Sequence, residues 1–346
     1  MRLLVLGGTW FLGRELVDRA LADGWEVTAF NRGKADAPPL PGAVEQVRGD
    51  RTVQADLDRL AGHGPWSAVV DTSAYLPADA LATARTLAAT VDRYVLVSTV
   101  NAYVGWPNEP LTESSLRLDG YADTMRADVA HLPEGAQYGV LKAGVERAVE
   151  SVLGERAVIL RPGVILGPGE YIGRLPWWLH RFEVGGTVLG PGDPNREIQP
   201  IDVRDVAMFA LLTARHRLTG AYNLAAPIGA ATFGALLAAC AEVTGSEADT
   251  VWVPDDLLDS FGVQQWTELP LWRTTLGAWR VDASRARAAG LVCRPLRETV
   301  ADTWAWLVSG GAPVNHPRWL EHGIDAAKER AILDAWRAQR SVAGEP

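Results

Sequence analysis

The stretch that decides the fold is Leu3-Leu4-Val5-Leu6-Gly7-Gly8-Thr9-Trp10-Phe11-Leu12-Gly13, close to the start of the chain. Its first four residues form a short apolar run, which is typical of a strand buried on both faces. From Arg14 to Leu21 the apolar residues recur at helical spacing, and Trp25–Phe30 predicts a second strand. The three segments therefore predict a strand, a glycine turn, a helix and a parallel strand, with the helix beginning at the turn.

A helix that begins at a glycine turn can bind an anion. The unpaired N–H groups of its first turn and its dipole suit the pyrophosphate of a dinucleotide. The glycines here follow G-x-x-x-x-x-G instead of the fingerprint G-x-G-x-x-G, and Trp10 stands where a middle glycine would be expected. The alternative is a tight strand-to-helix turn without a ligand. The turn residues that we predict to contact a cofactor are Gly7, Thr9, Trp10, Phe11, Leu12 and Gly13.

The residues after the second strand indicate which dinucleotide would bind. They read Asn31-Arg32-Gly33-Lys34, with no acidic residue before Asp36. An acidic residue at this place accepts from the ribose 2′-hydroxyl of NAD, whereas an arginine accommodates the 2′-phosphate of NADP. Asn31, Arg32 and Lys34 therefore favour NADP, although basic residues in a surface turn can also be simply solvated.

Strands and helices continue to alternate over the first half of the chain. Further strands are expected at 43–48, 66–71, 94–97 and 157–160, and helices at 52–60, 77–90 and 138–153. This alternation predicts an α/β fold of the Rossmann type, with a doubly wound parallel sheet and helices on both faces. Residues 101–137 interrupt the alternation, and a loop of this length inside a domain is usually functional or mobile.

The second half has a less regular pattern. Short strands are expected at 187–189, 198–201, 221–224 and 251–253, and helices at 203–215, 233–244, 284–289, 296–308 and 326–340. We therefore expect a dinucleotide-binding domain over 1–170, with returning segments at about 196–226. Residues 171–346 would mainly form a smaller α/β substrate domain, leaving a cleft between the two.

Other candidate residues follow the predicted strands of the first domain. Ligands bind open α/β sheets at the carboxyl ends of the strands. Asp50 could accept from an adenine amino group there, or it could cap the helix expected at 52–60. The further cofactor candidates at this edge are Asp50, Arg51, Ala74 and Ser98.

Composition narrows the function classes. The chain has 346 residues, a net charge of -9 and a pI near 5.3, which disfavour a non-specific nucleic-acid binder or a binder of anionic membranes. Cys240 and Cys293 lie in separate elements and suggest neither a disulfide framework nor a metal site. No apolar run reaches membrane-spanning length, and no signal-peptide pattern opens the chain, so cytoplasmic localisation is expected.

The candidate catalytic residues lie in the segment Tyr138-Gly139-Val140-Leu141-Lys142. Residues i and i+4 of a helix share one face, so the phenol and the ammonium would be neighbours. An ammonium beside a phenol favours the phenolate and lowers its pKa, which suits proton exchange with a substrate oxygen. Thr99, at the end of the preceding strand, could hydrogen-bond the same oxygen, or it could simply satisfy a backbone group.

With these parts together, the sequence resembles the short-chain dehydrogenase/reductase family, in its extended branch of NAD-dependent epimerases and dehydratases. The residues that carry the resemblance are the glycine turn, Asn31-Arg32, Gly49-Asp50, Ser98-Thr99, Tyr138 to Glu146, Arg161-Pro162, Gly167-Pro168-Gly169 and Val203 to Ala207. The resemblance implies catalytic roles for Thr99, Tyr138 and Lys142, with Lys142 also holding the nicotinamide ribose. It further implies that Pro162, Gly163 and Val164 lie near the nicotinamide, and that a homodimer is possible.

Two departures from the family pattern matter. Trp10 replaces a glycine, and the turn is similar to that of an atypical subgroup that includes chloroplast stem-loop RNA-binding proteins. Relatives that bind nucleotide sugars usually carry an arginine where this chain has Ile198, and Arg196 lies two residues away. An activated sugar is therefore possible as substrate but not favoured.

The sequence is unusually rich in tryptophan, with 14 residues that fall mostly in the second half. Such rings usually pack in cores, although they also suit a ring-containing ligand. The candidate contacts for a small-molecule substrate are Tyr103, Trp177, Trp178, His180, Arg181 and Arg196.

The sequence thus favours an NADP-dependent oxidoreductase that moves a hydride between nicotinamide and a carbonyl or alcohol carbon. One alternative is an epimerase or dehydratase of a nucleotide sugar that retains its cofactor. Another is a non-catalytic nucleotide-sensing or RNA-binding module of the same fold.

Overall fold

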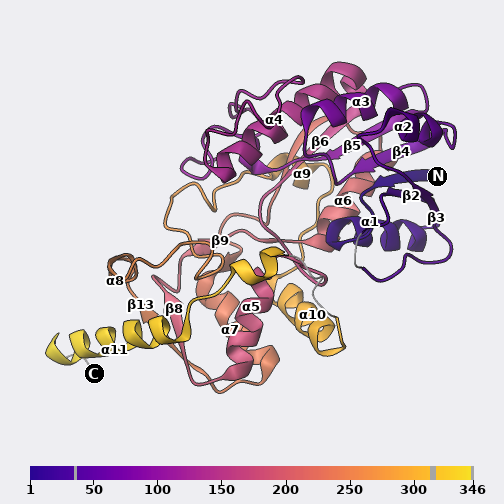
Figure 1. Ribbon diagram of the computed structural model, residues 1–346. Coiled ribbons are helices and arrows are strands. Elements are labelled where there is room, and N and C mark those ends of the chain that lie inside the picture. The colour runs from indigo at the N-terminus through magenta and orange to yellow at the C-terminus, as the bar shows by residue number, and fades with distance from the viewer. Residues whose placement is uncertain (35–36, 312–316, 344–346) are drawn as a thin grey trace. The chain divides into compact units, whose positions relative to one another are not determined.

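The computed structural model describes residues 1–34, 37–311 and 317–343 (Figure 1). The chain divides into two units. The first contains Met1–Ile165, Ile201–Pro227 and Leu276–Cys293, and the second contains Leu166–Pro200, Ile228–Thr275 and Arg294–Pro346. The first unit therefore includes a third segment, 276–293, that the sequence pattern assigns to the other domain.

A seven-stranded sheet forms the centre of the first unit, with the order β11-β6-β5-β4-β1-β2-β3. Every neighbouring pair runs parallel. The strands are β1 (Arg2–Leu6), β2 (Glu26–Asn31), β3 (Glu45–Arg48), β4 (Trp66–Asp71), β5 (Val91–Val97), β6 (Ala157–Pro162) and β11 (Gly220–Leu224). The sequential order reverses between β1 and β4, and in open α/β sheets a ligand crevice forms at such a reversal.

Helices cover both faces of this sheet (Figure 1). One face packs against α1 (Phe11–Ala22) and α6 (Val203–Arg215), whose apolar side chains share one core with β1 and β4. The other face packs against α2 (Gln54–Ala61), α3 (Pro77–Leu87) and α4 (Glu134–Leu153). This confirms the doubly wound Rossmann-type fold. Short elements of this unit are η1 (Val100–Ala102), η2 (Gly154–Arg156), β7 (Ile165–Leu166), β10 (Ile201–Asp202) and α9 (Ser284–Ala288).

The second unit is mainly helical, with two pairs of short strands. β8 and β13 pair in parallel, and β9 and β12 pair antiparallel. Its elements are α5 (Arg174–Val184), β8 (Thr187–Pro191), β9 (Glu197–Ile198), β12 (Ala231–Thr232), α7 (Phe233–Thr244), β13 (Asp249–Val253), α8 (Asp255–Ser260), α10 (Leu296–Val308), η3 (Pro317–Glu321) and α11 (Ala326–Ala343). In its core the Trp178 ring meets Phe233 edge to face, with the ring centroids 5.7 Å apart.

Several predicted elements need correction. The single strand expected at 198–201 is two strands, β9 and β10, because Pro200 has no N–H to continue a ladder. The helix expected from Tyr138 begins at Glu134, so the Tyr138–Lys142 pair lies inside the helix and not at its head. Helix α5 was not predicted from the sequence, and its Pro176 lies in the first turn, where proline is tolerated.

Of the stretch 101–137, residues 103–133 form turns and isolated bridges, while its two ends belong to η1 and α4. Tyr103 bridges Arg117, and Leu111 bridges Val281 from the third segment of the first unit. Among the described residues, no helix is long and apolar enough to cross a lipid bilayer.

Candidate active site

The glycine turn is fixed by close packing between β1 and β4. Gly7 has a φ of +90°, and a Cβ added there would lie 2.8 Å from Ser73 Cβ and from Thr72 Oγ1. A Cβ added at Gly13 would overlap the carbonyl oxygen of Gly7, so helix α1 lies directly against the turn. Glycine is therefore required at both positions, at Gly7 for its positive φ and at Gly13 for the close contact between helix α1 and the turn.

The tryptophan in the glycine turn has a simple backbone explanation. Trp10 has φ -125° and ψ 149°, an extended conformation that any residue adopts. Trp10 is the N-cap of α1, its side chain makes no capping hydrogen bond, and no acidic residue lies in the first helical turn. The first turn of α1 therefore contains no acidic side chain of its own that would compete with a pyrophosphate for its backbone N–H groups.

We expect Gly13→Ala to lower the free energy of unfolding by about 3 kcal/mol, because the added methyl group overlaps backbone that is itself tightly packed. Urea denaturation of the ligand-free protein measures the loss. Gly135→Ala is the matched control, since a Cβ there meets nothing within 4 Å and lies in the first turn of α4. Equal unfolding midpoints for the two variants would contradict the packing argument.

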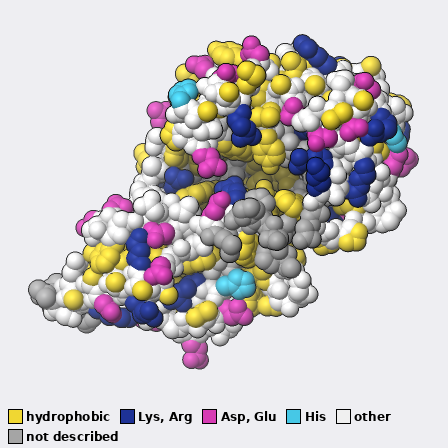
Figure 2. Space-filling view, viewed as in Figure 1, with side chains coloured by type: hydrophobic (Ala, Val, Ile, Leu, Met, Phe, Trp, Pro, Cys, Tyr) yellow, Lys and Arg dark blue, Asp and Glu magenta, His cyan; other side chains and the backbone are white. Residues whose placement is uncertain are grey.

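The ends of β2 and β3 carry the residues predicted to select NADP. The Asn31 side-chain oxygen accepts hydrogen bonds from Gly33 N at 3.0 Å and from Arg48. Arg32 and Lys34 are exposed, and Figure 2 shows Lys and Arg side chains gathered near β2 and β3. A small pocket lies here, lined by Thr9, Gly33, Ala37, Pro38, Pro39, Leu40, Gln46 and Arg48.

Arg48 is not predicted from the sequence, because it lies within β3 (Glu45–Arg48) and its position in the pattern is that of an outward-facing strand residue. Its guanidinium also donates to Gln46 Oε1 at 3.1 Å, which holds it at the pocket. The neighbouring Asp50 is not the N-cap of α2, because Val53 holds that place. Asp50 Oδ1 instead accepts from Thr52 N at 3.0 Å, and this hydrogen bond, aided by the charges of Arg32 and Lys34, lowers the pKa of Asp50.

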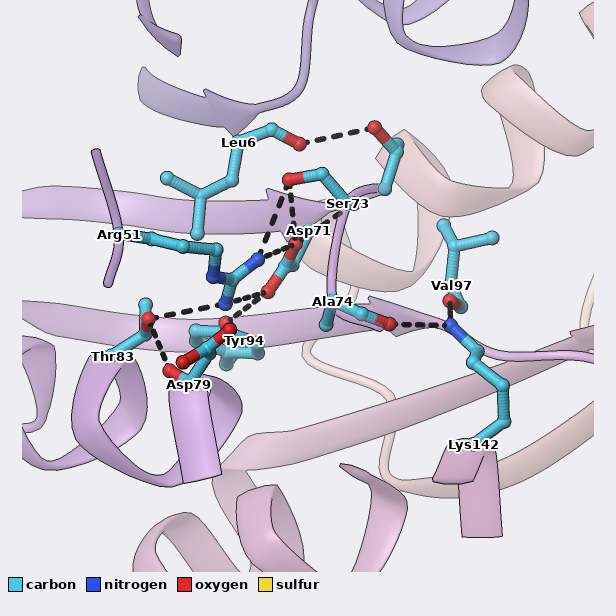
Figure 3. Close-up of polar contacts among 11 residues, drawn as sticks. Leu6, Arg51, Asp71, Ser73, Ala74, Asp79, Thr83, Tyr94, Val97 and Lys142 are labelled. Atoms are coloured by element: carbon cyan, nitrogen blue, oxygen red, sulfur yellow. Dashed lines mark hydrogen bonds and ion pairs between the residues drawn. The ribbon is translucent and has the colours of Figure 1, made fainter. Parts of the chain in front are cut away.

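Arg51 lies in a buried ion pair below the sheet edge (Figure 3). Its guanidinium donates to both oxygens of Asp71, at 2.9 and 2.8 Å, and to Thr83 at 3.1 Å. Asp71 also accepts from the Tyr94 hydroxyl at 2.6 Å. Burial would raise the pKa of Asp71, but the charge and hydrogen bonds of Arg51 keep it below its usual value. The structure thus places the Arg51 guanidinium against protein groups, where it supports the end of β4.

Lys142 is buried at the carboxyl ends of β4 and β5, with only 3% of its surface exposed (Figure 3). Its ammonium donates to Ala74 O at 3.0 Å and to Val97 O at 2.8 Å. Burial lowers the pKa of Lys142 to about 8, while Asp71 and Glu146 act in the opposite direction. The ammonium is therefore charged at neutral pH and fixed at the edge where the sheet binds ligands.

The other two predicted catalytic residues flank this lysine. Tyr138 lies one helical turn before Lys142 on α4 and is 37% exposed. Thr99 Oγ1 accepts from Asn101 N at 3.2 Å and so caps η1, which is the structural role that the sequence also allowed. Ser98, predicted as a cofactor contact, donates its hydroxyl to Glu146 Oε1 at 2.5 Å.

A buried network behind the site was not foreseen. Glu146 accepts from Arg161 Nε at 2.9 Å and Nη2 at 2.6 Å, and Arg161 Nη1 donates to the Tyr103 hydroxyl at 2.7 Å. That hydroxyl donates in turn to Asn223 Oδ1 at 2.8 Å. Tyr103, a substrate candidate by sequence, is only 1% exposed, and its hydroxyl joins the long loop to β6 and β11.

The predicted nicotinamide contacts follow β6. Gly163 N donates to Leu224 O at 2.9 Å, and Ile201 N donates to Val164 O at 2.8 Å. A Cβ added at Gly163 would meet only that Leu224 oxygen, at 3.8 Å, so there is open space beside this backbone. Pro162 and Val164 are buried.

The remaining substrate candidates belong to the second unit and make contacts within it. Trp178 is fully buried and donates its indole N–H to Pro270 O at 2.8 Å, and Trp177 packs edge-on against it with centroids 4.7 Å apart. His180 contacts Glu183 at 3.1 Å. Arg181 pairs with Glu329 at 3.1 Å, and Arg196 pairs with Asp255. Their role toward a substrate stays a prediction.

Comparisons with known proteins place the chain in a family that fits the Rossmann-type sheet and its glycine turn. The model of the NAD dependent epimerase/dehydratase family matches residues 3–225. A 2′-dehydrokanamycin reductase from Streptomyces kanamyceticus is 30% identical over 228 residues, 64% of this chain and 60% of the relative. A dTDP-6-deoxy-L-talose 4-dehydrogenase (NAD(P)(+)) from Kitasatospora kifunensis is 34% identical over 188 residues, 49% of this chain and 54% of the relative. The chain therefore spans less than two thirds of either relative.

Solved structures share the fold. A UDP-glucose 4-epimerase superposes with a TM-score of 0.68 at 15% identity, covering 91% of this chain and all of that one. A putative epimerase from Burkholderia cenocepacia superposes with a TM-score of 0.64 at 20% identity, covering 90% and 97%. At such identities the likeness concerns the fold alone.

Proposed function

The chain belongs to the NAD-dependent epimerase/dehydratase family, and from this premise we propose that it is an NADP-dependent oxidoreductase. It moves a hydride between nicotinamide and a carbonyl or alcohol carbon of a small molecule. The observation that carries the proposal is the buried Lys142 ammonium at the ends of β4 and β5, one helical turn from an exposed Tyr138. Burying an ammonium that has only two carbonyl partners costs free energy, and buried groups with perturbed pKa values cluster at functional sites.

Three side chains would assist the hydride transfer, each with a different role. When bound, the nicotinamide dinucleotide supplies or accepts the hydride. The Tyr138 hydroxyl gives its proton to the substrate carbonyl oxygen in reduction and takes it back in oxidation. The Lys142 charge favours the phenolate, and its third N–H remains for a ribose hydroxyl. The Thr99 hydroxyl donates to Asn101 Oδ1 at 3.4 Å in this structure, and with substrate bound it would turn to donate to the reacting oxygen while its lone pairs still cap η1.

The turn fits a dinucleotide, since its backbone is shaped by Gly7 and Gly13 and no acidic residue lies in the first turn of α1. The preference for the phosphorylated form rests on Arg48, which lines the small pocket at β2 and β3, and on the exposed Arg32 and Lys34, which are the chain neighbours of the lining residue Gly33. The Asn31 side-chain oxygen accepts hydrogen bonds from Gly33 and Arg48 and so fixes two residues that line this pocket. Arginine forks match the oxygens of a 2′-phosphate.

Binding of NADPH and NADH to the purified protein tests the cofactor proposal. We expect Arg32→Ala to raise the Kd for NADPH about tenfold or more and to leave the Kd for NADH nearly unchanged, because a charged hydrogen bond contributes about 1.5–3 kcal/mol. Arg85→Ala, at an exposed arginine on α3, is the matched control. NADH binding as tightly as NADPH in the wild type would contradict the assignment.

The names of the two curated relatives describe net redox reactions on sugar-containing compounds, one as a reductase and one as a dehydrogenase. They support a substrate with a ketone or secondary alcohol on a sugar-like ring. Stoichiometric consumption of NADPH with such a ketone is the expected result. Conversion of a nucleotide sugar without net consumption of cofactor would favour the epimerase or dehydratase alternative instead.

A further inference from the structure

A short segment that follows β4 connects the end of β1 with the buried lysine (Figure 3). Thr72 N and the Thr72 hydroxyl each donate to Leu6 O at 3.0 Å. Two residues later, Ala74 O accepts from the Lys142 ammonium at 3.0 Å. The position of this carbonyl group, and with it that of the ammonium, therefore depends on how residues 72–74 are held.

The Arg51–Asp71 ion pair holds the same segment. Asp71 Oδ1 accepts from Ser73 N at 3.0 Å, and Arg51 Nη1 donates to Ser73 Oγ at 3.3 Å. The Asp71 side chain is fully buried, and it also accepts from two Arg51 nitrogens and from the Tyr94 hydroxyl. A carboxylate bound by a guanidinium fork and further donors has a fixed orientation. The ion pair thus fixes the backbone one residue before the carbonyl group that Lys142 binds.

Charged groups from three parts of the first unit act on the Lys142 ammonium. Asp71 at the end of β4 and Glu146 on α4 stabilise it by their negative charge, and Arg51 opposes them. Glu146 lies one helical turn after Lys142 and is itself paired with Arg161 at 2.6 Å. Asp71 therefore combines two effects, because it both binds the segment after β4 and carries a charge opposite to that of the ammonium.

Three tyrosines contribute to the surroundings of this lysine. The Tyr75 ring centroid lies 5.8 Å from Lys142 Nζ, and Tyr138 lies one helical turn before Lys142 on α4. The Tyr94 hydroxyl on β5 donates to Asp71 at 2.6 Å. Burial raises the pKa of Tyr94 well above its usual value, so this phenol stays neutral while Lys142 titrates.

We propose that Asp71 is a positioning residue for Lys142. Paired with Arg51, its carboxylate fixes the segment that presents the Ala74 carbonyl group to the ammonium, and its negative charge stabilises that ammonium. Asp71 is fully buried, so it acts through the lysine and not by touching a substrate. Its importance for catalysis rests on the proposed function, but its effect on Lys142 can be measured without turnover.

The titration of the Lys142 side chain tests the proposal, followed by NMR of the full, ligand-free chain labelled with ¹³C at lysine Cε. The sequence has only three lysines, Lys34, Lys142 and Lys328, so the signal retained in both Lys34→Met and Lys328→Met belongs to Lys142. Asp71→Asn removes the stabilising charge and leaves the Arg51 guanidinium. We therefore expect this variant to lower the pKa of Lys142 by at least about one unit.

Arg51→Gln should move the same pKa in the opposite direction. It removes a like charge, while Asp71 keeps its hydrogen bonds from Ser73 N and the Tyr94 hydroxyl and stays ionised at the alkaline pH where Lys142 titrates. We expect a rise of at least about half a unit. If the ion pair were only structural, removing either member would break the same contact and shift the pKa of Lys142 in one direction.

Asp79→Asn is the matched control, at a half-buried aspartate in the first turn of α3. The Arg51 charge acts on Asp79 as it does on Asp71, but this variant should leave the pKa of Lys142 unchanged. Urea midpoints show which variants fold, and each variant tests the proposal by itself. The proposal is overturned if folded Asp71→Asn does not lower the pKa of Lys142, or if folded Arg51→Gln does not raise it.

Steady-state kinetics separate this inference from the proposed function. A fall in the pKa of Lys142 from about 8 to about 7 lowers its charged fraction at pH 8 from about one half to about one tenth. With a ring ketone as substrate, kcat of Asp71→Asn at pH 8 should therefore fall about fivefold and recover at lower pH. The expected pKa shifts without any change in kcat would support the positioning of Lys142 and contradict the proposed reaction.

Discussion

Tyr138→Phe will lower kcat by about two to four orders of magnitude while leaving the Kd for NADPH within about twofold of the wild type. The phenol is the proposed proton donor, it is 37% exposed on α4, and removing its oxygen should leave the helix and the buried Lys142 unchanged. Steady-state kinetics with a ring ketone and fluorescence titration of NADPH measure the two quantities.

The matched control for this variant is Tyr121→Phe, at a tyrosine of the first unit that is 55% exposed and stacks with Arg147. It should retain wild-type kcat. Full activity in Tyr138→Phe would exclude this phenol as the acid, and an equal loss in both variants would indicate a general effect of removing a surface hydroxyl.

Lys142→Met will abolish most activity, and it will also change how stability depends on pH. The pKa of Lys142 is lowered from 10.5 to about 8, mainly by burial. Between these pH values the unfolded chain binds a proton that the folded chain does not, so the stability of the wild type rises with pH. Below pH 8 the full cost of the buried charge is present, and above 10.5 it is absent.

At about 1.4 kcal/mol for each pKa unit, this difference corresponds to about 3 kcal/mol. The free energy of unfolding of the wild type, relative to Lys142→Met, should therefore rise by about that amount from pH 7 to 10.5. Urea denaturation of the ligand-free proteins measures it. A parallel titration of Lys34→Met, at an exposed lysine, controls for loss of an ammonium. A flat difference across this range would show that Lys142 is not buried as a cation.

Local patterns were enough to predict the first unit's sheet. Apolar runs such as Leu3–Leu6 and Trp66–Asp71 form central strands because both faces of a parallel sheet are buried. The spacing of Tyr138 and Lys142 predicted a shared helix face, and the structure has both on α4. What local spacing could not show was how deeply the lysine is buried, which depends on carbonyl groups from Ala74 and Val97.

Contacts between distant residues were not predictable in this way. Arg51 and Asp71 are 20 residues apart, and no periodicity links them, so the sequence predicts Arg51 as a cofactor contact at a strand end and not as the partner of Asp71. Arg48 reads as a solvated strand residue until Asn31 is seen beside it. The pairing of Leu111 with Val281 likewise depends on the third segment of the first unit.

The division of the first unit into three chain segments has a consequence during biosynthesis. A ribosome releases the amino terminus first, at about 5–20 residues per second. Strand β6 is complete by residue 162, but its partner β11 begins at residue 220, and the last segment ends at 293. Until β11 has been translated, the β6 edge of the sheet in a nascent chain is unpaired, and an unpaired edge is a template for aggregation. The first unit can therefore complete its fold only after residue 293 has been translated, although its first strands are made at the start of synthesis.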